Sequence, residues 1–364
     1  TIGGVERVVH ELAKRQVAAG NDVLVASRRL DASAKTSYLI HEGVRYIKFP
    51  FVAFPFAVNG LVYRFNPEVV HVNSYLAAKF LRPRSQPVML RHIHDVLGHS
   101  AGAYFGAKLG PIFPPIERYL VEGYSNYIVP SVSTKRKLQS SVNHGARIWV
   151  VPNGVDTSVF YPRKKGWLHA KLSLPEDEKL ILFLGRLALG KGALEALRGS
   201  MPLLVERKAS LVYIGPSETS LSSGQKPALG HILREARAAG VEQRVFRLGP
   251  QCDNDLASAL SDCQVLVCPS TSEGFGLVVL EAASCGTPSV VYPAGSLPEV
   301  VENGVTGVVT DECTPSSLSA ALEDLLSASG EAELRQMSLA CTDKAKSYDW
   351  ENTYTKLMKI YGSL

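Results

Sequence analysis

The sequence lacks the features that would anchor or crosslink a protein. Its longest apolar run, around Phe51 to Tyr63, is interrupted by proline, asparagine and glycine, and it is too short to span a bilayer. The six cysteines form no Cys-x-x-Cys pair and no finger-like spacing with histidine, which argues against a zinc finger and against a disulfide framework. We therefore expect reduced cysteines and a cytoplasmic protein.

Motifs of several other protein classes are also missing. Neither half of the chain contains Gly-x-Gly-x-x-Gly after a strand, the fingerprint of a dinucleotide-binding domain. A nicotinamide-dependent oxidoreductase, which two doubly wound domains could otherwise suggest, is therefore disfavoured. No nucleic-acid-binding motif, internal repeat or low-complexity segment occurs, so we expect no nucleic-acid partner.

The composition describes a globular protein whose charge is unevenly distributed. The 364 residues, 46% hydrophobic and 20% charged, suffice for two domains of ordinary size. From Thr1 to Val155 there are 19 Lys/Arg and 9 Asp/Glu residues, whereas the remainder has 20 and 25. A basic first half beside an acidic second half indicates that the first half binds something anionic, such as an acceptor or a membrane surface.

Strand-like and helix-like segments alternate in two series, which indicates an α/β protein with two doubly wound parallel sheets. Between the series lies VPNGVDTSVFYPRKKGW, rich in glycine, proline and charge. We interpret it as the interdomain linker; a plain surface loop is the alternative. The predicted domains are residues 1–155 and 156–347, and residues 348–364 include a last helix over Trp350 to Tyr361.

A strand, a turn and a helix follow one another near residue 270. Val265 to Cys268 is an apolar run typical of a buried strand, and Pro269 to Gly276 contains small and turn-forming residues. A helix is predicted from Leu277, with a stop at Gly286. In an open α/β sheet such a turn lies at the carboxyl edge of the strands, where ligands bind. Its free backbone N–H groups suit a phosphate.

Two carboxylates, Glu273 and Glu281, frame this turn and helix. Glu281 lies about one turn into the predicted helix, and a carboxylate inside such a helix can accept two hydrogen bonds from a vicinal diol such as a ribose. The alternative from spacing alone is two solvated glutamates around an ordinary turn.

The full string PSTSEGFGLVVLEAASCGTPSVV resembles the E-x7-E donor-site motif of retaining glycosyltransferases with the GT-B fold, in particular glycosyltransferase family 4. The resemblance implies two Rossmann-like domains facing a central cleft, with the acceptor site in the first domain and the donor site in the second. It also implies that the last helix packs back onto the first domain. The implied donor-binding residues of this string are Glu273, Gly274, Phe275, Gly276, Leu277 and Glu281. Of these, Glu281 would bind the ribose and Glu273 would lie near the donor sugar.

Two cations precede this motif in LGRLALGKG. Arg186 follows a predicted strand and Lys191 stands at a helix start, so both could reach one anion; two surface cations are the alternative. The string is similar to the family segment whose Arg and Lys hold the donor diphosphate. Fixed cations could replace a metal ion, so we predict transfer without metal or cofactor.

The first domain contributes further candidates by resemblance. In VMLRHIHDVLG, His94 matches the family's cleft histidine better than His92; a satisfied strand-end histidine is the alternative. Gly3 and Gly4 resemble the family's Gly-Gly loop, which approaches the donor phosphate. In the family a strand precedes this loop, so we expect the first sheet to lack its N-terminal strand.

Two regions of the second domain are weaker site candidates. Glu299, in SLPEVVENGVTG, resembles a segment beside the donor pocket, although a helix-capping carboxylate is an equal alternative. Recognition of the nucleotide base is expected near Arg247 to Gln251, and these side chains do not decide between bases.

The predicted function is that of a hexosyltransferase-type glycosyltransferase, which passes a sugar from a nucleoside-diphosphate-sugar to an acceptor hydroxyl with retention. The resemblance implies a front-face displacement in which the donor phosphate takes the acceptor proton, with His94, Glu273, Arg186 and Lys191 in catalytic roles. The resemblance also implies that the two domains close across the cleft, with a hinge near Asn153 and Gly154. An epimerase, an inverting transferase and a non-catalytic nucleotide-sugar-binding protein remain alternatives.

Two apolar, aromatic segments occur in the basic first domain, Phe49 to Phe65 and Ala103 to Leu120. The second mixes Tyr104 and Phe105 with Lys108. Because such segments can insert beside anionic lipid, we predict peripheral binding at the cytoplasmic face of a membrane, with an anionic or lipid-linked acceptor. Ordinary packed helices, with charge serving solubility, are the alternative.

Overall fold

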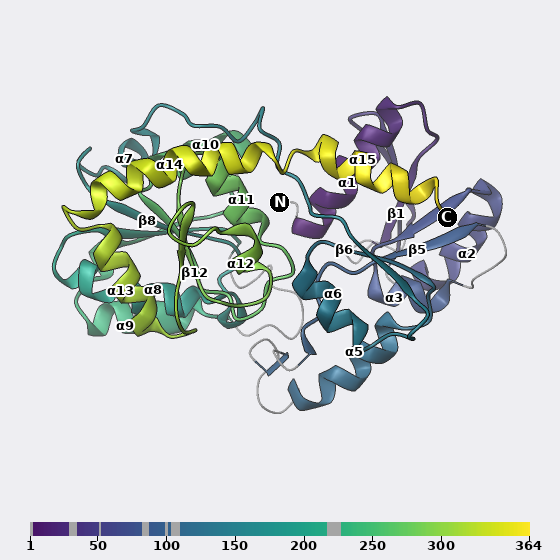
Figure 1. Ribbon diagram of the computed structural model, residues 1–364, viewed down its shortest axis with the longest axis horizontal. Helices are drawn as coiled ribbons and strands as arrows, with labels where there is room; N and C mark the ends of the chain where they lie inside the picture. The colour runs from purple at the N-terminus through teal and green to yellow at the C-terminus, as the bar shows by residue number, and fades with distance from the viewer. Residues whose placement is uncertain are drawn as a thin grey trace. The chain divides into compact units, whose positions relative to one another are not determined.

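The structure is a computed structural model that describes residues 3–28, 35–50, 52–81, 87–98, 101–102, 110–216 and 227–364 (Figure 1). The chain divides into two compact units. The N-terminal unit contains Ile2–Val96, Pro115–Gly154 and Trp350–Leu364, and the C-terminal unit contains Leu97–Pro114 and Val155–Asp349. These limits lie next to the predicted ones, except that residues 97–114 group with the C-terminal unit.

The C-terminal unit is built on one parallel sheet, as predicted for a doubly wound domain. The strand order is β10-β9-β8-β11-β12-β13, and every neighbouring pair is parallel. The strands are β8 (Leu180–Leu184), β9 (Ser210–Ile214), β10 (Val245–Leu248), β11 (Val265–Cys268), β12 (Ser289–Val291) and β13 (Gly307–Val309).

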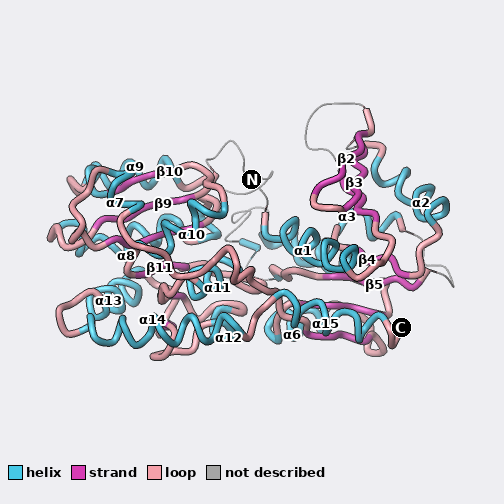
Figure 2. Tube along the Cα trace, turned by 90° about the horizontal axis from the view of Figure 1, so that it is seen from above, coloured by secondary structure: helices cyan, strands magenta, loops and turns pink. Residues whose placement is uncertain are grey.

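Helices cover both faces of this sheet (Figure 2). Alternate residues of β8 enter different cores: Leu180 and Leu182 pack with one set of helices, Ile181 and Phe183 with the other. This burial on both faces explains why the strands are continuous apolar runs. The helices are α7 (Trp167–Leu172), α8 (Ala193–Val205), α9 (Leu229–Ala238), α10 (Asp253–Asp262), α11 (Leu277–Ser284), α12 (Leu297–Val300), α13 (Pro315–Leu325) and α14 (Gly330–Lys346), with 3₁₀ turns at Leu189–Lys191 and Glu242–Arg244.

The sheet reverses its winding direction between β8 and β11. From β8 the chain proceeds to β9 and β10 on one side, and then returns to β11, β12 and β13 on the other. At such a switch point the loops after the two central strands diverge, which opens a crevice at their carboxyl ends. The loops that follow β8 and β11 are therefore the expected place for a ligand.

The N-terminal unit has two sheets among its described residues. One has the order β1-β3-β2 and the other β4-β5-β6-β7, so β1 and β4 are both edge strands. All pairs are parallel except β2 with β3; this β2–β3 hairpin was not predicted. The strands are β1 (Leu24–Arg28), β2 (Ser37–His41), β3 (Val44–Phe49), β4 (Val69–Val72), β5 (Val88–His92), β6 (Asn126–Val129) and β7 (Arg147–Val150).

The last helix of the chain, α15 (Trp350–Tyr361), belongs to this N-terminal unit and packs on α1 (Gly4–Ala18) (Figure 1). The Arg15 Nε donates to the Glu351 carboxylate across 2.7 Å. Trp350 is fully buried and leaves no room for a side chain at Gly154. The other helices are α2 (Phe54–Phe65), α3 (Tyr75–Phe80), α5 (Phe113–Val121) and α6 (Val132–Gln139). The 3₁₀ turn at Gly110–Ile112, just before α5, groups with the C-terminal unit. None of the helices in the described ranges is long and apolar enough to cross a membrane.

Candidate functional site

The loop after β8 carries the two predicted cations. Arg186 is half-buried directly beyond the strand, and Lys191 ends the 3₁₀ turn that leads into α8. Gly192 follows with a φ of +75°, and a Cβ at this position would overlap the Pro269 carbonyl oxygen. Glycine is therefore required here for both its backbone angle and its size. This close approach holds Lys191 against the loop that follows β11.

Lys191 and Glu273 form an ion pair between these two loops. The Lys191 Nζ lies 2.8 Å from the Glu273 Oε2, and the two side chains are 24% and 19% exposed. The structure thus brings together two of the residues that the sequence predicted for the donor site. An incoming diphosphate at this edge would compete with Glu273 for the Lys191 ammonium, since both are anions.

The loop containing Glu273 is also fixed from the other side, by the loop after β12. The Glu273 carbonyl oxygen accepts hydrogen bonds from both the Ser296 N–H and the Ser296 Oγ, each at 3.0 Å. Gly295 lies so close to the Glu273 backbone that a Cβ would not fit. Three loops at the carboxyl edge of the sheet are therefore interlocked before any ligand binds, which reduces the ordering cost of binding.

The remaining motif residues form the start of α11. Gly274 and Phe275 are buried, and the Phe275 ring packs edge-on against Tyr348 with centroids 5.9 Å apart. Gly276 is the N-cap residue with a φ of +93° and provides no side-chain cap, and Leu277 begins the helix. A helix N-terminus without a side-chain cap presents backbone N–H groups that suit an anion.

Glu281, which the resemblance assigns to the ribose, is more buried than a surface carboxylate would be. The residue is only 6% exposed, in the middle of α11, which packs on α14. Burial, and secondarily the Glu281 carboxylate, raises the pKa of the Cys285 thiol to about 12. Because the Glu281 side chain is buried, replacing it changes the packing of α11 as well as any contact with a ligand.

The N-terminal unit holds His94 in a row of three histidines, of which His92 is buried and His71 and His94 are partly buried. His94 Nε2 donates to the Asn73 Oδ1 across 2.8 Å, and its ring stacks on His92 with centroids 4.0 Å apart. His92 Nδ1 lies 3.2 Å from His71 Nε2, and His71 Nδ1 lies 2.8 Å from the Tyr361 hydroxyl. Burial lowers the pKa of His94 to about 3 and that of His71 to about 4. Both rings are therefore neutral at pH 7, and His94 Nδ1 is an acceptor.

Gly3 and Gly4 also belong to the N-terminal unit. Gly3 is the N-cap of α1 in an extended conformation, without a side-chain cap, and Gly4 is the first helical residue. The predicted Gly-Gly turn is thus a helix start, a geometry that suits a phosphate.

The weaker candidates lie on the surface of the C-terminal unit. Glu299 is exposed in the first turn of α12, where a carboxylate favourably meets the helix dipole. Arg247 is exposed at β10. The chain contains one Asp-x-Asp sequence, Asp253 to Asp255, in the first turn of α10. Because two carboxylates spaced in this way can hold a divalent metal ion, the prediction of metal independence rests on Arg186 and Lys191 alone.

One group of side chains was missed by sequence reasoning. Among the described residues, His10, His41 and Glu42 are the one set of three potential metal ligands whose ligand atoms converge. They come from α1 and from the β2–β3 hairpin. Spacing could not reveal them, because the hairpin itself was not predicted.

Comparisons with known proteins agree with the predicted family. The family model described as Glycosyltransferase Family 4 matches residues 2–159 of this chain. The family model described as Glycosyl transferases group 1 matches residues 165–342. The D-inositol 3-phosphate glycosyltransferases of Mycobacterium bovis and Mycobacterium tuberculosis are 33% identical over 303 residues, which cover 81% of this chain. The chain spans 61% of the length of these curated relatives.

Solved structures show the same architecture. A sucrose-phosphate synthase from Thermosynechococcus elongatus matches with a TM-score of 0.84 at 22% identity, over 99% of this chain and 93% of that one. HepE from Anabaena, solved in complex with UDP-glucose, matches with a TM-score of 0.76 at 17% identity, over 100% and 97%. These likenesses show the GT-B fold. The two family models, together with the relatives that are 33% identical, establish that the chain belongs to the group 1, family 4 glycosyltransferases.

Proposed function

We propose that this protein transfers a sugar from a nucleoside-diphosphate-sugar to an acceptor hydroxyl. The observation that carries the proposal is the Lys191–Glu273 ion pair, held between the loops after β8 and β11 at the switch point of the sheet. A basic side chain fixed at a strand edge, beside an uncapped helix start, suits a diphosphate leaving group. HepE, which has the same fold, was solved with UDP-glucose, and this supports a donor of the same chemical class.

Each site residue has a proposed role in donor binding. Arg186 and Lys191 hold the diphosphate, the backbone of Gly274 to Leu277 adds N–H donors, and Glu281 binds the ribose. Glu273 forms an ion pair with Lys191 in the free protein and lies near the donor sugar once the donor is bound. His94, neutral at pH 7, accepts a hydrogen bond from a sugar hydroxyl at Nδ1.

The proposed reaction retains the anomeric configuration. The acceptor oxygen bonds to the anomeric carbon on the face from which the nucleoside diphosphate departs, and a phosphate oxygen takes the acceptor proton. Negative charge then grows on the diphosphate as its bond to the sugar breaks. Fixed cations stabilise that charge without a metal ion, which is the basis for proposing metal-independent transfer.

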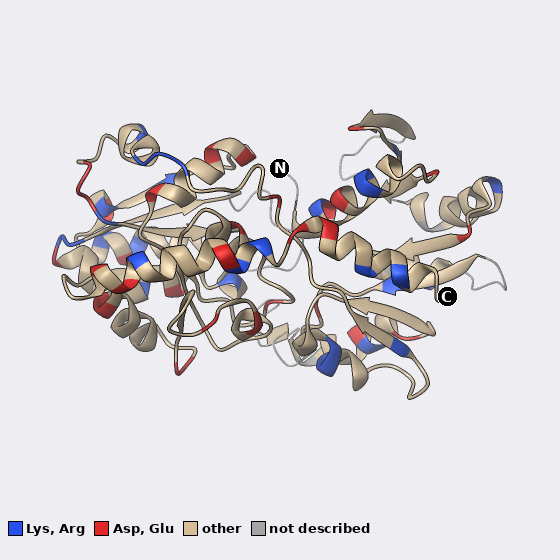
Figure 3. Ribbon diagram, turned by 45° about the horizontal axis from the view of Figure 1, so that its top comes forward, with Lys and Arg blue, Asp and Glu red and all other residues tan. Residues whose placement is uncertain are grey.

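An anionic acceptor is the second part of the proposal. The matching mycobacterial relatives are named for an inositol phosphate, and residues 1–155 carry an excess of Lys and Arg. Figure 3 shows basic residues on several elements of the N-terminal unit. A phosphorylated acceptor, either free or linked to lipid, fits this charge.

The surface of α2, α3 and α5 suggests where a membrane could bind. Phe56 and Tyr63 are 72% and 75% exposed, seven residues apart on one face of α2. The Phe56 ring contacts Phe80, with centroids 5.8 Å apart, and the neighbouring Lys79 ammonium lies 4.3 Å from the Tyr119 ring centroid. We name this set the α2–α5 patch. It combines apolar rings with a cation, as peripheral membrane surfaces do; Tyr104, Phe105 and Lys108, also predicted for such a surface, lie outside the described residues.

The transferase proposal is tested in two steps. A thermal-shift screen with UDP, GDP and ADP should show a rise in the unfolding midpoint with one of them, since a ligand at about 100 times its dissociation constant adds roughly 2.7 kcal/mol. The matching nucleotide-sugar is then incubated with inositol 3-phosphate or with a lipid-linked phosphate acceptor. Nuclear magnetic resonance of the product reports the anomeric configuration. Interconversion of the donor sugar without acceptor would indicate an epimerase, and an inverted product would contradict retention.

Vesicle co-sedimentation tests the α2–α5 patch. Binding to phosphatidylglycerol vesicles, but not to phosphatidylcholine vesicles, is expected and should weaken with salt. The double variant Phe56→Ser, Tyr63→Ser should lose it. Leu339→Ser, at an exposed apolar position on α14 of the other unit, is the matched control. If the protein bound neither kind of vesicle at low salt, the proposed membrane role would be contradicted.

A further inference from the structure

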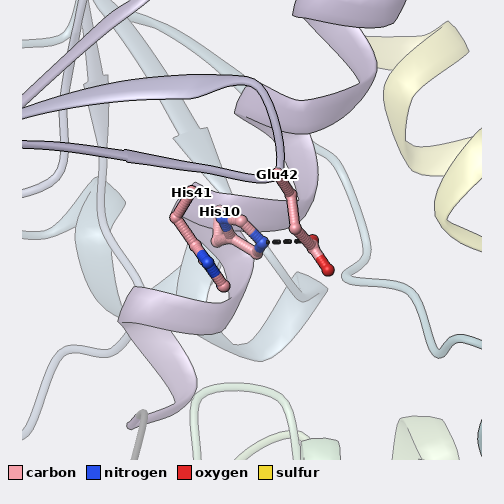
Figure 4. A group of neighbouring side chains, drawn as sticks. All are labelled: His10, His41 and Glu42. Carbon is pink, nitrogen blue, oxygen red and sulfur yellow. Dashed lines mark hydrogen bonds and ion pairs between the residues drawn. The ribbon is translucent and has the colours of Figure 1, made fainter.

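The β2–β3 hairpin places a carboxylate and an imidazole beside α1. His41 ends β2 and Glu42 is the first residue of the turn into β3, while His10 projects from α1 toward them (Figure 4). The His10 Nε2 lies 2.8 Å from the Glu42 Oε2, and the His10 and His41 rings stack with centroids 5.2 Å apart. One nitrogen of each ring and one carboxylate oxygen lie within 4.8 Å of one another.

The second nitrogen of His10 is held by a neighbour. The His10 Nδ1 lies 2.5 Å from the hydroxyl of Tyr46, on β3. Metal-binding histidines commonly have such a partner, which fixes the ring orientation and directs the other nitrogen at the metal. The ring of His10 is thus oriented as a ligand would be, with Nε2 directed at the carboxylate.

The distances are close to those of a metal centre. A tetrahedral zinc ion with bonds of about 2.0–2.1 Å separates its nitrogen and oxygen ligands by roughly 3.4 Å. The observed 2.8 Å between His10 Nε2 and Glu42 Oε2 would therefore have to open by about half an ångström. His41 is exposed, so its ring can rotate to supply the third ligand.

The backbone at Glu42 is an independent sign that its side chain matters. Glu42 has a φ of +46° and Gly43 a φ of +76°, which is the two-residue hairpin turn that favours asparagine or glycine at both positions. A glutamate in the left-handed region is sparsely populated and is found where the surroundings hold it. Here the surroundings are His10 and Lys14, whose ammonium lies 3.3 Å from the same carboxylate oxygen.

We propose that His10, His41 and Glu42 bind one first-row divalent metal ion, with zinc as the representative, and that water completes the coordination. Two imidazoles and one carboxylate are the ligand set that suits Zn²⁺, Ni²⁺ and Co²⁺ better than Mg²⁺ or Ca²⁺. Lys14 moves away when the metal binds; its side chain is 34% exposed and already lies 3.7 Å from Glu11.

The metal ion would crosslink α1 and the β2–β3 hairpin. Its three ligands join two elements that are 31 residues apart in sequence, so bound metal lowers the freedom of the chain between them. The helix it fixes is the one that begins at Gly3 and Gly4. The three ligands include none of the residues proposed to bind the donor, so we assign the metal ion a structural role, independent of the proposed transfer.

Metal titration of chelator-treated protein without a histidine tag tests the proposal. Calorimetry with Zn²⁺ should show one saturable equivalent, and Co²⁺ should give the absorption bands of a low-symmetry site. The variants His41→Ala and Glu42→Gln should each weaken binding at least tenfold. His144→Ala, at an exposed histidine of the same unit, should bind as the unaltered chain does. No saturable binding at millimolar Zn²⁺, or full binding by both ligand variants, would overturn the proposal.

A further variant separates loss of a ligand from loss of the fold. Glu42→Gly removes the carboxylate and suits the left-handed turn, so the metal-free variant should unfold at a temperature no lower than the unaltered protein. Zn²⁺ should raise the unfolding midpoint of the unaltered protein and not that of Glu42→Gly. An equal rise in both would show that zinc acts elsewhere.

Discussion

Lys191 donates a hydrogen bond to Glu273 across 2.8 Å, and this contact joins residues 82 positions apart in the sequence. The pair gives the proposed donor site an internal counterion before any ligand binds. A diphosphate would replace the carboxylate as the partner of the ammonium, so binding exchanges one ion pair for another. The contribution of the Lys191 ammonium to catalysis then depends on the additional negative charge that develops on the diphosphate during transfer.

Removing either cation should therefore affect turnover more than folding. Arg186→Ala and Lys191→Ala should each reduce kcat/KM by about 100- to 1,000-fold, because one fixed charge at a leaving group contributes roughly 3–4 kcal/mol. Steady-state kinetics with the identified donor measure this. Lys208→Ala, an exposed lysine paired with Glu206, is the control. Turnover within a factor of two for both site variants would refute the diphosphate role.

Chelation should separate stability from catalysis. With EDTA the turnover should be unchanged at a temperature well below unfolding, while the unfolding midpoint should fall if the His10 site is filled as isolated. Asp253→Asn and Asp255→Asn should leave turnover unaffected as well. If EDTA abolished turnover and Mg²⁺ or Mn²⁺ restored it, the cations would not be replacing a metal.

Glu281 should be needed for affinity toward the nucleoside diphosphate. Glu281→Gln keeps the volume of the buried side chain and should weaken binding in calorimetry by at least tenfold, since the ribose loses a charged acceptor. Glu281→Ala should also lower the unfolding midpoint, because the side chain is buried in α11. Glu299→Gln, exposed on α12, serves as the comparison. Unchanged affinity in Glu281→Gln would remove this residue from the ribose site.

Acid should destabilise the N-terminal unit through histidines whose pKa is lowered in the folded state. Desolvation lowers the pKa of His71 from its ordinary value of about 6.5 to about 4, so between these pH values the unfolded chain binds a proton that the folded chain does not. The free energy of unfolding therefore falls as pH drops from about 6.5 to 4, and His71 alone contributes about 3 kcal/mol to this loss.

Urea unfolding at a series of pH values measures this dependence. His71→Gln should show a shallower loss of stability over the same range. His144→Gln, where the histidine is exposed, should follow the unaltered protein. A His71→Gln profile with unchanged slope would show that His71 is not responsible.

The parts of the fold that could be predicted are those with strong local signals. The buried strands β8 and β11 are continuous apolar runs, and α15 was predicted with its observed bounds. The ion pair of Lys191 with Glu273 could not be derived from spacing, because it depends on β8 and β11 being neighbours in the sheet. Family resemblance placed both residues in one site without indicating that they pair.

The missed features have physical reasons too. β2 is almost wholly exposed, so its sequence shows no alternation of buried and exposed residues, and its turn contains Glu42 where asparagine is the usual signal. The burial of Glu281 was missed because a helix packed on both sides has no polar face to reveal its orientation. Such positions are decided by neighbours that lie far away in the sequence.

The place of α15 has a consequence for protein synthesis. Its residues Trp350 and Tyr361 complete the N-terminal unit, through the contact with Gly154 and the hydrogen bond to His71. On the ribosome these residues emerge only after the whole C-terminal unit has been translated. The N-terminal unit therefore leaves the ribosome first but completes its fold last. Until α15 has been synthesised, the face of α1 that packs on α15 stays uncovered. Nascent chains stalled before Trp350 should consequently be the ones that chaperones retain.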